Sequence, residues 1–106
     1  MRQLEPNEVR ELLARPASGL QLLDVRLPWE HETARLPGST LIPMHEIARR
    51  VGELDRTKPV IVYCHHGVRS LQVALFLERS GFSDVINLSG GIDAYSLEAD
   101  PSIPRY

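Results

Sequence analysis

The single cysteine, Cys64, is the residue whose type and setting most clearly predict chemistry. It ends the apolar run 60–63 and is followed by a short loop that contains Gly67 and reaches Arg69. This order is typical of a buried strand, a tight loop and the first turn of a helix, where backbone N–H groups converge near the positive end of a helix dipole. We therefore expect Cys64 to be a thiolate, the nucleophilic form, exposed enough to be sensitive to oxidation.

The loop from Cys64 to Arg69 has the composition of an anion-binding cradle. Gly67 permits backbone angles that turn successive N–H groups toward one point. Arg69 adds a planar, permanently charged fork that could hold loop or substrate oxygens, so Cys64 and Arg69 are the expected catalytic residues. The remaining residues expected to contact a substrate are His65, His66, Gly67, Val68 and Ser70. A thiolate in such a cradle suits two reactions, transfer of sulfane sulfur and attack on an oxyanion such as phosphate or arsenate.

Three charged residues, Asp24, Arg26 and Glu30, lie at or just after another apolar run, 20–25. Because the carboxyl ends of parallel strands meet at one edge of a sheet, we expect these residues near the cysteine loop. Charged hydrogen bonds from them would support that loop. The pattern favours a structural ion-pair network over direct catalysis.

Other interpretations of the cysteine and histidines are weaker. A free cysteine is often a buried, inert apolar residue. His65 and His66 invite a metal site with Cys64, but adjacent side chains are expected to diverge, and the sequence supplies no further cysteine or spaced histidine for a tetrahedral set. We expect no metal, and we expect His31 and His45 to be exposed to solvent.

The scaffold for these residues follows from hydrophobic periodicity. Strands are predicted at 20–25, 40–42, 60–63 and 85–88, and helical segments at 5–13, 29–34, 45–54, 69–80 and 92–98. The continuous apolar run 60–63 is typical of a central parallel strand covered on both faces. Strands that alternate with helices predict an α/β fold with a mainly parallel central sheet and helices on both faces.

Length and composition limit the class of protein. The 106 residues are expected to form a single domain, 1–106, of ordinary composition, with 42% hydrophobic and 25% charged residues. A net charge of −2 does not suggest nucleic acid as a partner. No signal-peptide pattern stands at the start, and no apolar run is long enough to span a membrane. One cysteine excludes an internal disulfide, so a cytoplasmic location is expected.

Motifs along almost the whole chain resemble those of the rhodanese family of sulfurtransferases, most closely its compact single-domain bacterial members. In chain order they are Leu23-Asp24-Val25-Arg26 with Glu30, Leu36-Pro37-Gly38-Ser39 with Ile42-Pro43, the run Val60 to Cys64 with Gly67, Arg69 and Ser70, Gly81-Phe82 with Val85 and Leu88, and Gly90-Gly91-Ile92 with Ala94-Tyr95. Each stretch alone is weak evidence for the family, but all of them in this order are a specific signal. The resemblance implies a three-layer rhodanese-like fold.

The resemblance also implies a two-step exchange of sulfur. The Cys64 thiolate attacks the outer sulfur of a donor such as thiosulfate, which releases sulfite and leaves a Cys64 persulfide. A second nucleophile, cyanide or a thiol, then removes the outer sulfur, so that one hard transfer becomes two easier ones. The implied partners are small sulfur donors and thiol or protein acceptors. No cofactor is implied, because the cysteine itself carries the sulfur.

Two alternatives stay open. A small phosphatase or arsenate reductase would use the same cysteine, but the related enzymes of that kind have a loop one residue longer than the six residues from Cys64 to Arg69. The other alternative is a sulfur-relay or partner-binding module with little turnover of small molecules. His65 and His66 are neutral histidines, whereas lysine or arginine at these positions would attract a dianion. The sequence therefore leaves open whether thiosulfate is the donor.

Overall fold

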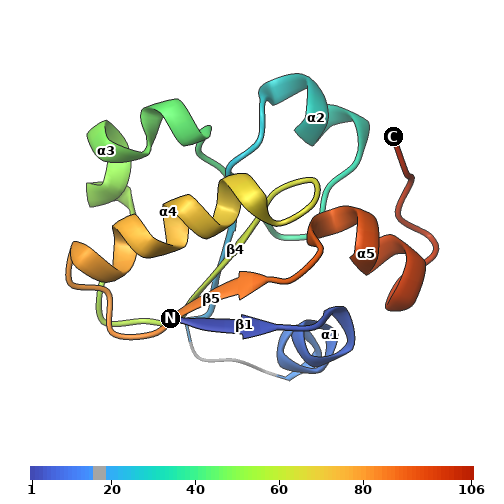
Figure 1. Ribbon diagram of the computed structural model, residues 1–106, viewed down its shortest axis with the longest axis horizontal. Helices are drawn as coiled ribbons and strands as arrows, with labels where there is room; N and C mark the ends of the chain where they lie inside the picture. Colours follow the sequence, from blue (N-terminus) through green and yellow to red (C-terminus); the bar gives the residue numbers. More distant parts are fainter. Residues whose placement is uncertain (16–18) are drawn as a thin grey trace.

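The computed structural model describes residues 1–15 and 19–106, and within them five strands form one sheet in the order β1-β5-β4-β2-β3 (Figure 1). The strands are β1 (Arg2–Leu4), β2 (Gln21–Asp24), β3 (Thr40–Leu41), β4 (Val60–Tyr63) and β5 (Val85–Leu88). All four pairings are parallel, which confirms the predicted α/β fold. The carboxyl ends of the strands therefore share one edge of the sheet.

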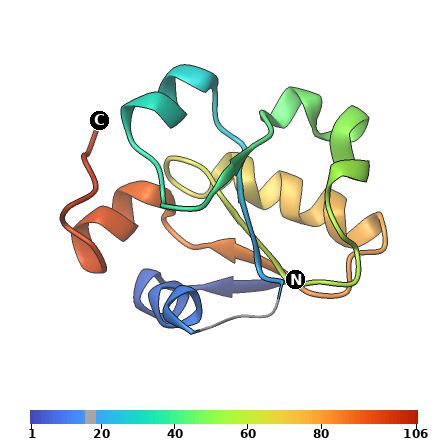
Figure 2. The same ribbon diagram turned by 180° about the vertical axis from the view of Figure 1, so that it is seen from behind.

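Helices cover both faces of this sheet (Figures 1 and 2). They are α1 (Pro6–Ala14), α2 (Pro28–Thr33), α3 (Ile47–Arg50), α4 (Val68–Arg79) and α5 (Gly91–Glu98), with 3-10 turns at Met44–Glu46 and Val51–Glu53. The helices α1 and α5 lie on one face, and α3 and α4 lie on the other. Of the helices described, none combines the length and apolar character that crossing a bilayer requires.

The central strand β4 divides the core in two. Its side chains alternate between the faces of the sheet, as in any strand. Ile61 and Tyr63 belong to the apolar cluster with α1 and α5, whereas Val62 and Cys64 belong to the cluster with α4. The alternation therefore directs the Cys64 side chain toward the face that α4 covers.

Two elements differ from the sequence prediction. The strand β1 was not predicted, because its three residues at the sheet edge include the exposed and polar Arg2 and Gln3. The single helix predicted at 45–54 is divided into a 3-10 turn, the short α3 and a second 3-10 turn. Apolar residues three and four apart fit such turns as well as a helix, and Gly52 weakens a continuous helix.

Candidate functional site

The Cys64 sulfur lies in a cradle of backbone N–H groups. Cys64 directly follows β4, and its Sγ accepts hydrogen bonds from the N–H groups of Gly67, at 3.1 Å, and Ser70, at 3.4 Å. Gly67 precedes α4 with a φ of +97°, a conformation that glycine adopts without strain. The sulfur therefore faces the amino end of a 12-residue helix, where dipoles and unpaired N–H groups favour an anion.

Cys64 itself is only 1% exposed, so the expectation of an exposed sulfur is wrong. The alternation of β4 turns the side chain into the cluster under α4, and the loop that follows folds back over it. The thiolate state of Cys64 stays a prediction. The loop therefore covers the sulfur.

The beginning of the loop is held by α5. The N–H of Ile92 donates to the Cys64 carbonyl at 2.9 Å, and the N–H of Asp93 donates to the His65 carbonyl at 3.1 Å. A Cβ atom at Gly91 would overlap the His65 carbonyl, so only glycine permits this close approach. The Gly90-Gly91 turn thus brings the last helix to the cysteine loop.

The end of the loop is held by α2. The Arg69 guanidinium donates twice to the Glu30 carboxylate, at 2.7 Å and 3.0 Å. Burial alone would raise the pKa of Glu30, but hydrogen bonds from Arg69, Tyr106 and the Leu27 N–H outweigh burial and lower that pKa to about 2. Arg69 is therefore committed to a buried carboxylate and ties the first turn of α4 to α2.

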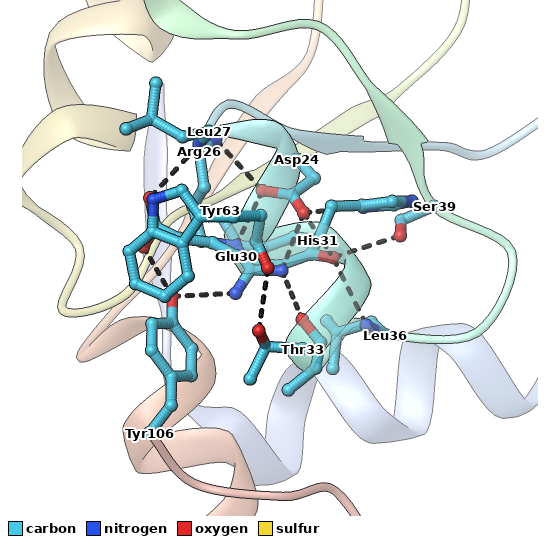
Figure 3. A network of polar contacts seen from close by, with 12 residues as sticks. Asp24, Arg26, Leu27, Glu30, His31, Thr33, Leu36, Ser39, Tyr63 and Tyr106 are labelled. Carbon is cyan, nitrogen blue, oxygen red and sulfur yellow. Dashed lines mark hydrogen bonds and ion pairs between the residues drawn. The ribbon is translucent and has the colours of Figure 1, made fainter.

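Asp24 and Arg26 form a buried ion pair behind this contact (Figure 3). Both side chains are fully buried, and the Arg26 guanidinium donates to the two Asp24 oxygens at 2.8 Å and 2.7 Å. A third Arg26 nitrogen donates to the Tyr106 hydroxyl at 2.7 Å. The three charged residues singled out in the sequence, Asp24, Arg26 and Glu30, thus belong to one connected network; that this network supports the loop stays a hypothesis.

Three members of the network have no local sequence signal. Tyr106 donates to Glu30 Oε2 at 2.6 Å across a separation of 76 residues. His31, expected to be exposed, has its Nδ1 2.8 Å from Asp24 Oδ2, because the first turns of α2 fold back over the end of β2. The hydroxyl of Tyr63 reaches Asp24 Oδ2 at 3.3 Å and Ser39 at 3.0 Å. The topology brings Tyr63 and Tyr106 to their distant partners, whereas His31 lies seven residues from Asp24.

The two loop histidines do not diverge as expected. The rings of His65 and His66 stack at a centroid distance of 4.0 Å and an interplanar angle of 25°, and His65 also stacks on Tyr106. Asp93 joins them, and a ligand atom from each of the three residues falls within 4.8 Å of the others. However, the Arg105 guanidinium donates to Asp93 at 2.9 Å and puts a positive charge where a metal ion would need the carboxylate.

The predicted contact residues of the loop differ in exposure. Gly67 and Ser70 are buried at the sulfur, His65 is half-buried, and His66 and Val68 are exposed. The Ser70 hydroxyl is buried and has no hydrogen-bond partner among the residues described. An unpaired buried hydroxyl is costly, which makes it a candidate donor to an atom bound at the sulfur.

Comparison with known proteins agrees with this geometry. The family model described as "Rhodanese-like domain" matches residues 5–98. The "Thiosulfate sulfurtransferase GlpE" of Pseudomonas syringae is 39% identical over 77 residues, which are 73% of each chain. The crystal structure of a rhodanese-related protein from Thermoplasma volcanium superposes with a TM-score of 0.86 at 27% identity over 100% of both chains.

A longer relative contains a similar stretch. The "Rhodanese-like/PpiC domain-containing protein 12, chloroplastic" of Arabidopsis thaliana is 46% identical over 90 residues. These residues are 81% of this chain but 30% of the plant protein, so the chain spans less than a third of that relative.

Proposed function

The chain belongs to the rhodanese-like domain family, and we propose that it is a sulfurtransferase that carries sulfane sulfur as a Cys64 persulfide. The observation that supports this proposal best is the hydrogen bonding of Cys64 Sγ by the N–H groups of Gly67 and Ser70. A nucleophilic cysteine needs stabilisation of its anion, and the amino end of α4 can supply it.

The reaction that we propose has two steps. The Cys64 thiolate attacks the outer sulfur of the donor, thiosulfate for example, and forms a new S–S bond. The old S–S bond breaks, and sulfite leaves with its electron pair. A thiophilic acceptor, cyanide or a thiolate, then attacks the outer sulfur of the persulfide and returns Cys64 as a thiolate. The negative charge stays within reach of the same N–H groups throughout.

A sulfur-relay module is the second candidate. Cys64 is 1% exposed, and side chains near the loop present apolar surface to solvent, with Trp29 57% and Val68 67% exposed. Such surface suits docking of a protein that offers or accepts a cysteine persulfide. Under this candidate the same Cys64 persulfide forms, but small donors are used slowly. A reducing, cytoplasmic location is part of both proposals, because a lone reactive thiol is preserved there.

The experiment that tests the proposal is intact-mass spectrometry of the protein after incubation with thiosulfate, before and after addition of cyanide. We expect one added sulfur on the wild-type chain, removed by cyanide, and none on Cys64→Ser. The variant serves as the matched control if its circular dichroism and thermal unfolding match those of the wild type. An adduct that persists in Cys64→Ser would contradict the proposal. No adduct from thiosulfate but one from a protein persulfide would favour the relay.

A further inference from the structure

A tyrosine distant in sequence lies against the cysteine loop. The ring of Tyr106 stacks on His65 with a centroid distance of 4.0 Å and an interplanar angle of 10°. His65 also stacks on His66, and two rings cannot occupy the same face, so His65 lies between Tyr106 and His66. Trp29 meets Tyr106 edge-on, with 5.7 Å between the ring centroids. The tyrosine ring therefore links α2 to the second residue of the loop.

The hydroxyl of Tyr106 contacts the other end of the loop. It accepts a hydrogen bond from Arg26 Nη1 at 2.7 Å and donates to Glu30 Oε2 at 2.6 Å (Figure 3). The same Glu30 carboxylate holds Arg69, the last residue of the loop, through two hydrogen bonds. The Tyr106 hydroxyl thus connects the buried pair of Asp24 and Arg26 with the Glu30 carboxylate that binds Arg69 at the start of α4.

We propose that Tyr106 is a positioning residue for the Cys64 loop, its ring holding His65 and its hydroxyl holding Glu30 against Arg69. Sulfur transfer needs the N–H groups of Gly67 and Ser70 to face the sulfur. Tyr106 restrains the loop at His65, before Gly67, and, through Glu30, at Arg69, directly before Ser70. The consequence for turnover rests on the proposed sulfurtransferase function. The restraint itself is a property of the fold and can be measured without it.

Tyr106 is itself firmly placed. The residues that precede it are tied to α5, because the Ser96 hydroxyl donates to the Ile103 carbonyl at 2.6 Å and Arg105 pairs with Asp93. Ile103 is buried in the apolar cluster under α1 and α5. Since Asp93 also donates its N–H to the His65 carbonyl, the segment 100–106 and the loop share one support.

The burial of His65 and the charged groups around it shift its pKa, so the contact with Tyr106 can be followed through the titration of His65. Burial lowers the pKa of His65, and the neighbouring His66 and Arg69 lower it further, while Asp93 and Glu30 act in the opposite direction. Removal of the Tyr106 ring would return His65 to water and raise its pKa. Burial and the hydrogen bond to Glu30 raise the pKa of Tyr106 to about 12, so its hydroxyl stays protonated and able to donate at neutral pH.

The test compares Tyr106→Leu, which removes the ring and the hydroxyl, with Tyr106→Phe, which removes the hydroxyl alone. Tyr95→Phe, a change to a buried tyrosine in α5, is the matched control. Four quantities are measured. Two are the pKa values of the His65 ring and of the Glu30 carboxyl, both from NMR titration. The others are the rate of Cys64 alkylation by iodoacetamide and kcat/KM for transfer from thiosulfate to cyanide.

We expect Tyr106→Leu to raise the pKa of His65, to change the alkylation rate and to lower kcat/KM by about two- to tenfold, the range that an aromatic stack supports. Tyr106→Phe should leave the His65 titration as in the wild type and raise the pKa of Glu30, which loses a donor. The control should change none of these quantities.

Unchanged His65 titration and alkylation in Tyr106→Leu would overturn the proposal. If that variant does not fold, an unchanged Glu30 titration in Tyr106→Phe overturns it instead. Shifted titrations in a protein whose wild type moves no sulfur would support the positioning role and reject the proposed function.

Discussion

Ser70 contributes its backbone N–H to the Cys64 sulfur and leaves its own hydroxyl buried without a partner among the residues described. Folded proteins rarely leave such a group unpaired without a reason. The proposed function supplies a chemical reason, because the outer sulfur of a persulfide would add an acceptor beside Sγ. At this scale the site is a set of donors fixed before any substrate arrives, which is how a site stabilises developing charge.

Replacement of Ser70 by alanine separates this role from a structural one. The variant keeps the N–H donor and removes a hydroxyl that forms no hydrogen bond within the described chain, so stability should change by less than about 1 kcal/mol. The rate of persulfide formation should fall by roughly two- to tenfold, the value of one hydrogen bond. Thermal unfolding and timed mass spectrometry measure the two quantities.

Ser80→Ala is the matched control for this prediction. Ser80 lies directly after α4, at the opposite end from Ser70, and its hydroxyl donates to the Phe76 carbonyl at 2.8 Å. This change should affect stability and leave the rate of persulfide formation as it is. Equal rates of persulfide formation for Ser70→Ala and the wild type would show that the Ser70 hydroxyl takes no part in that step.

At the scale of elements, the loop is a junction of three helices. The amino end of α4 faces the sulfur, α5 holds the carbonyls of Cys64 and His65, and α2 holds Arg69 through Glu30. Glu30 is the central contact of α2, because it is buried and binds both Arg69 and Tyr106. A charged pair of this kind depends on the ionisation of its acid.

The ionisation of Glu30 should therefore link stability to pH. Its pKa is about 2 in the folded protein and 4.5 in its ordinary state, so the folded form favours the carboxylate. The stabilisation is fully present above pH 4.5 and is lost as the pH falls toward 2. Glu30→Gln should lower the free energy of unfolding by about 1–3 kcal/mol at pH 7 and by much less at pH 3. Urea denaturation at both pH values measures the difference.

Glu32→Gln provides the comparison for this pH dependence. Glu32 is an exposed carboxylate of the same short helix, and its replacement should have nearly the same small effect at pH 7 and at pH 3. A destabilisation by Glu30→Gln that is as large at pH 3 as at pH 7 would show that shape, not charge, makes Glu30 necessary.

These contacts also show what a sequence can and cannot predict. The position of the cysteine loop was predictable because Cys64, Gly67 and Arg69 are contiguous with a strand and a helix whose periodicity is clear. Tyr106 was not, because a tyrosine near Pro104 has no periodicity and gains its role only when the segment 100–106 folds back. The burial of Cys64 required knowledge of which face of β4 the loop covers, which depends on the pairing of strands rather than on local residues.

At the scale of the whole molecule, the charges near the cradle are already paired. Arg69 is bound to Glu30 and Arg105 to Asp93, and burial lowers the pKa of His65, which favours its neutral form. The chain carries a net charge of −2. If thiosulfate is the donor, this dianion is attracted mainly by the N–H groups at α4, whereas a persulfide anion carries a single negative charge and is repelled less by the net negative chain.

We accordingly expect the protein to bind thiosulfate weakly, and we expect a lysine side chain introduced beside the loop to strengthen this binding. His66 is exposed beside the loop, and His66→Lys should lower the KM for thiosulfate by roughly two- to fivefold with little change in kcat, an effect that 0.5 M salt should largely remove. Thr57→Lys adds the same charge before β4, at the opposite edge of the sheet from Cys64, and should leave KM unchanged. An alkyl persulfide carries a single negative charge at neutral pH, so His66→Lys should lower its KM less than it lowers the KM for thiosulfate. Equal effects of both lysines on thiosulfate would mean that net charge, not the pairing of charges around the cradle, selects the donor.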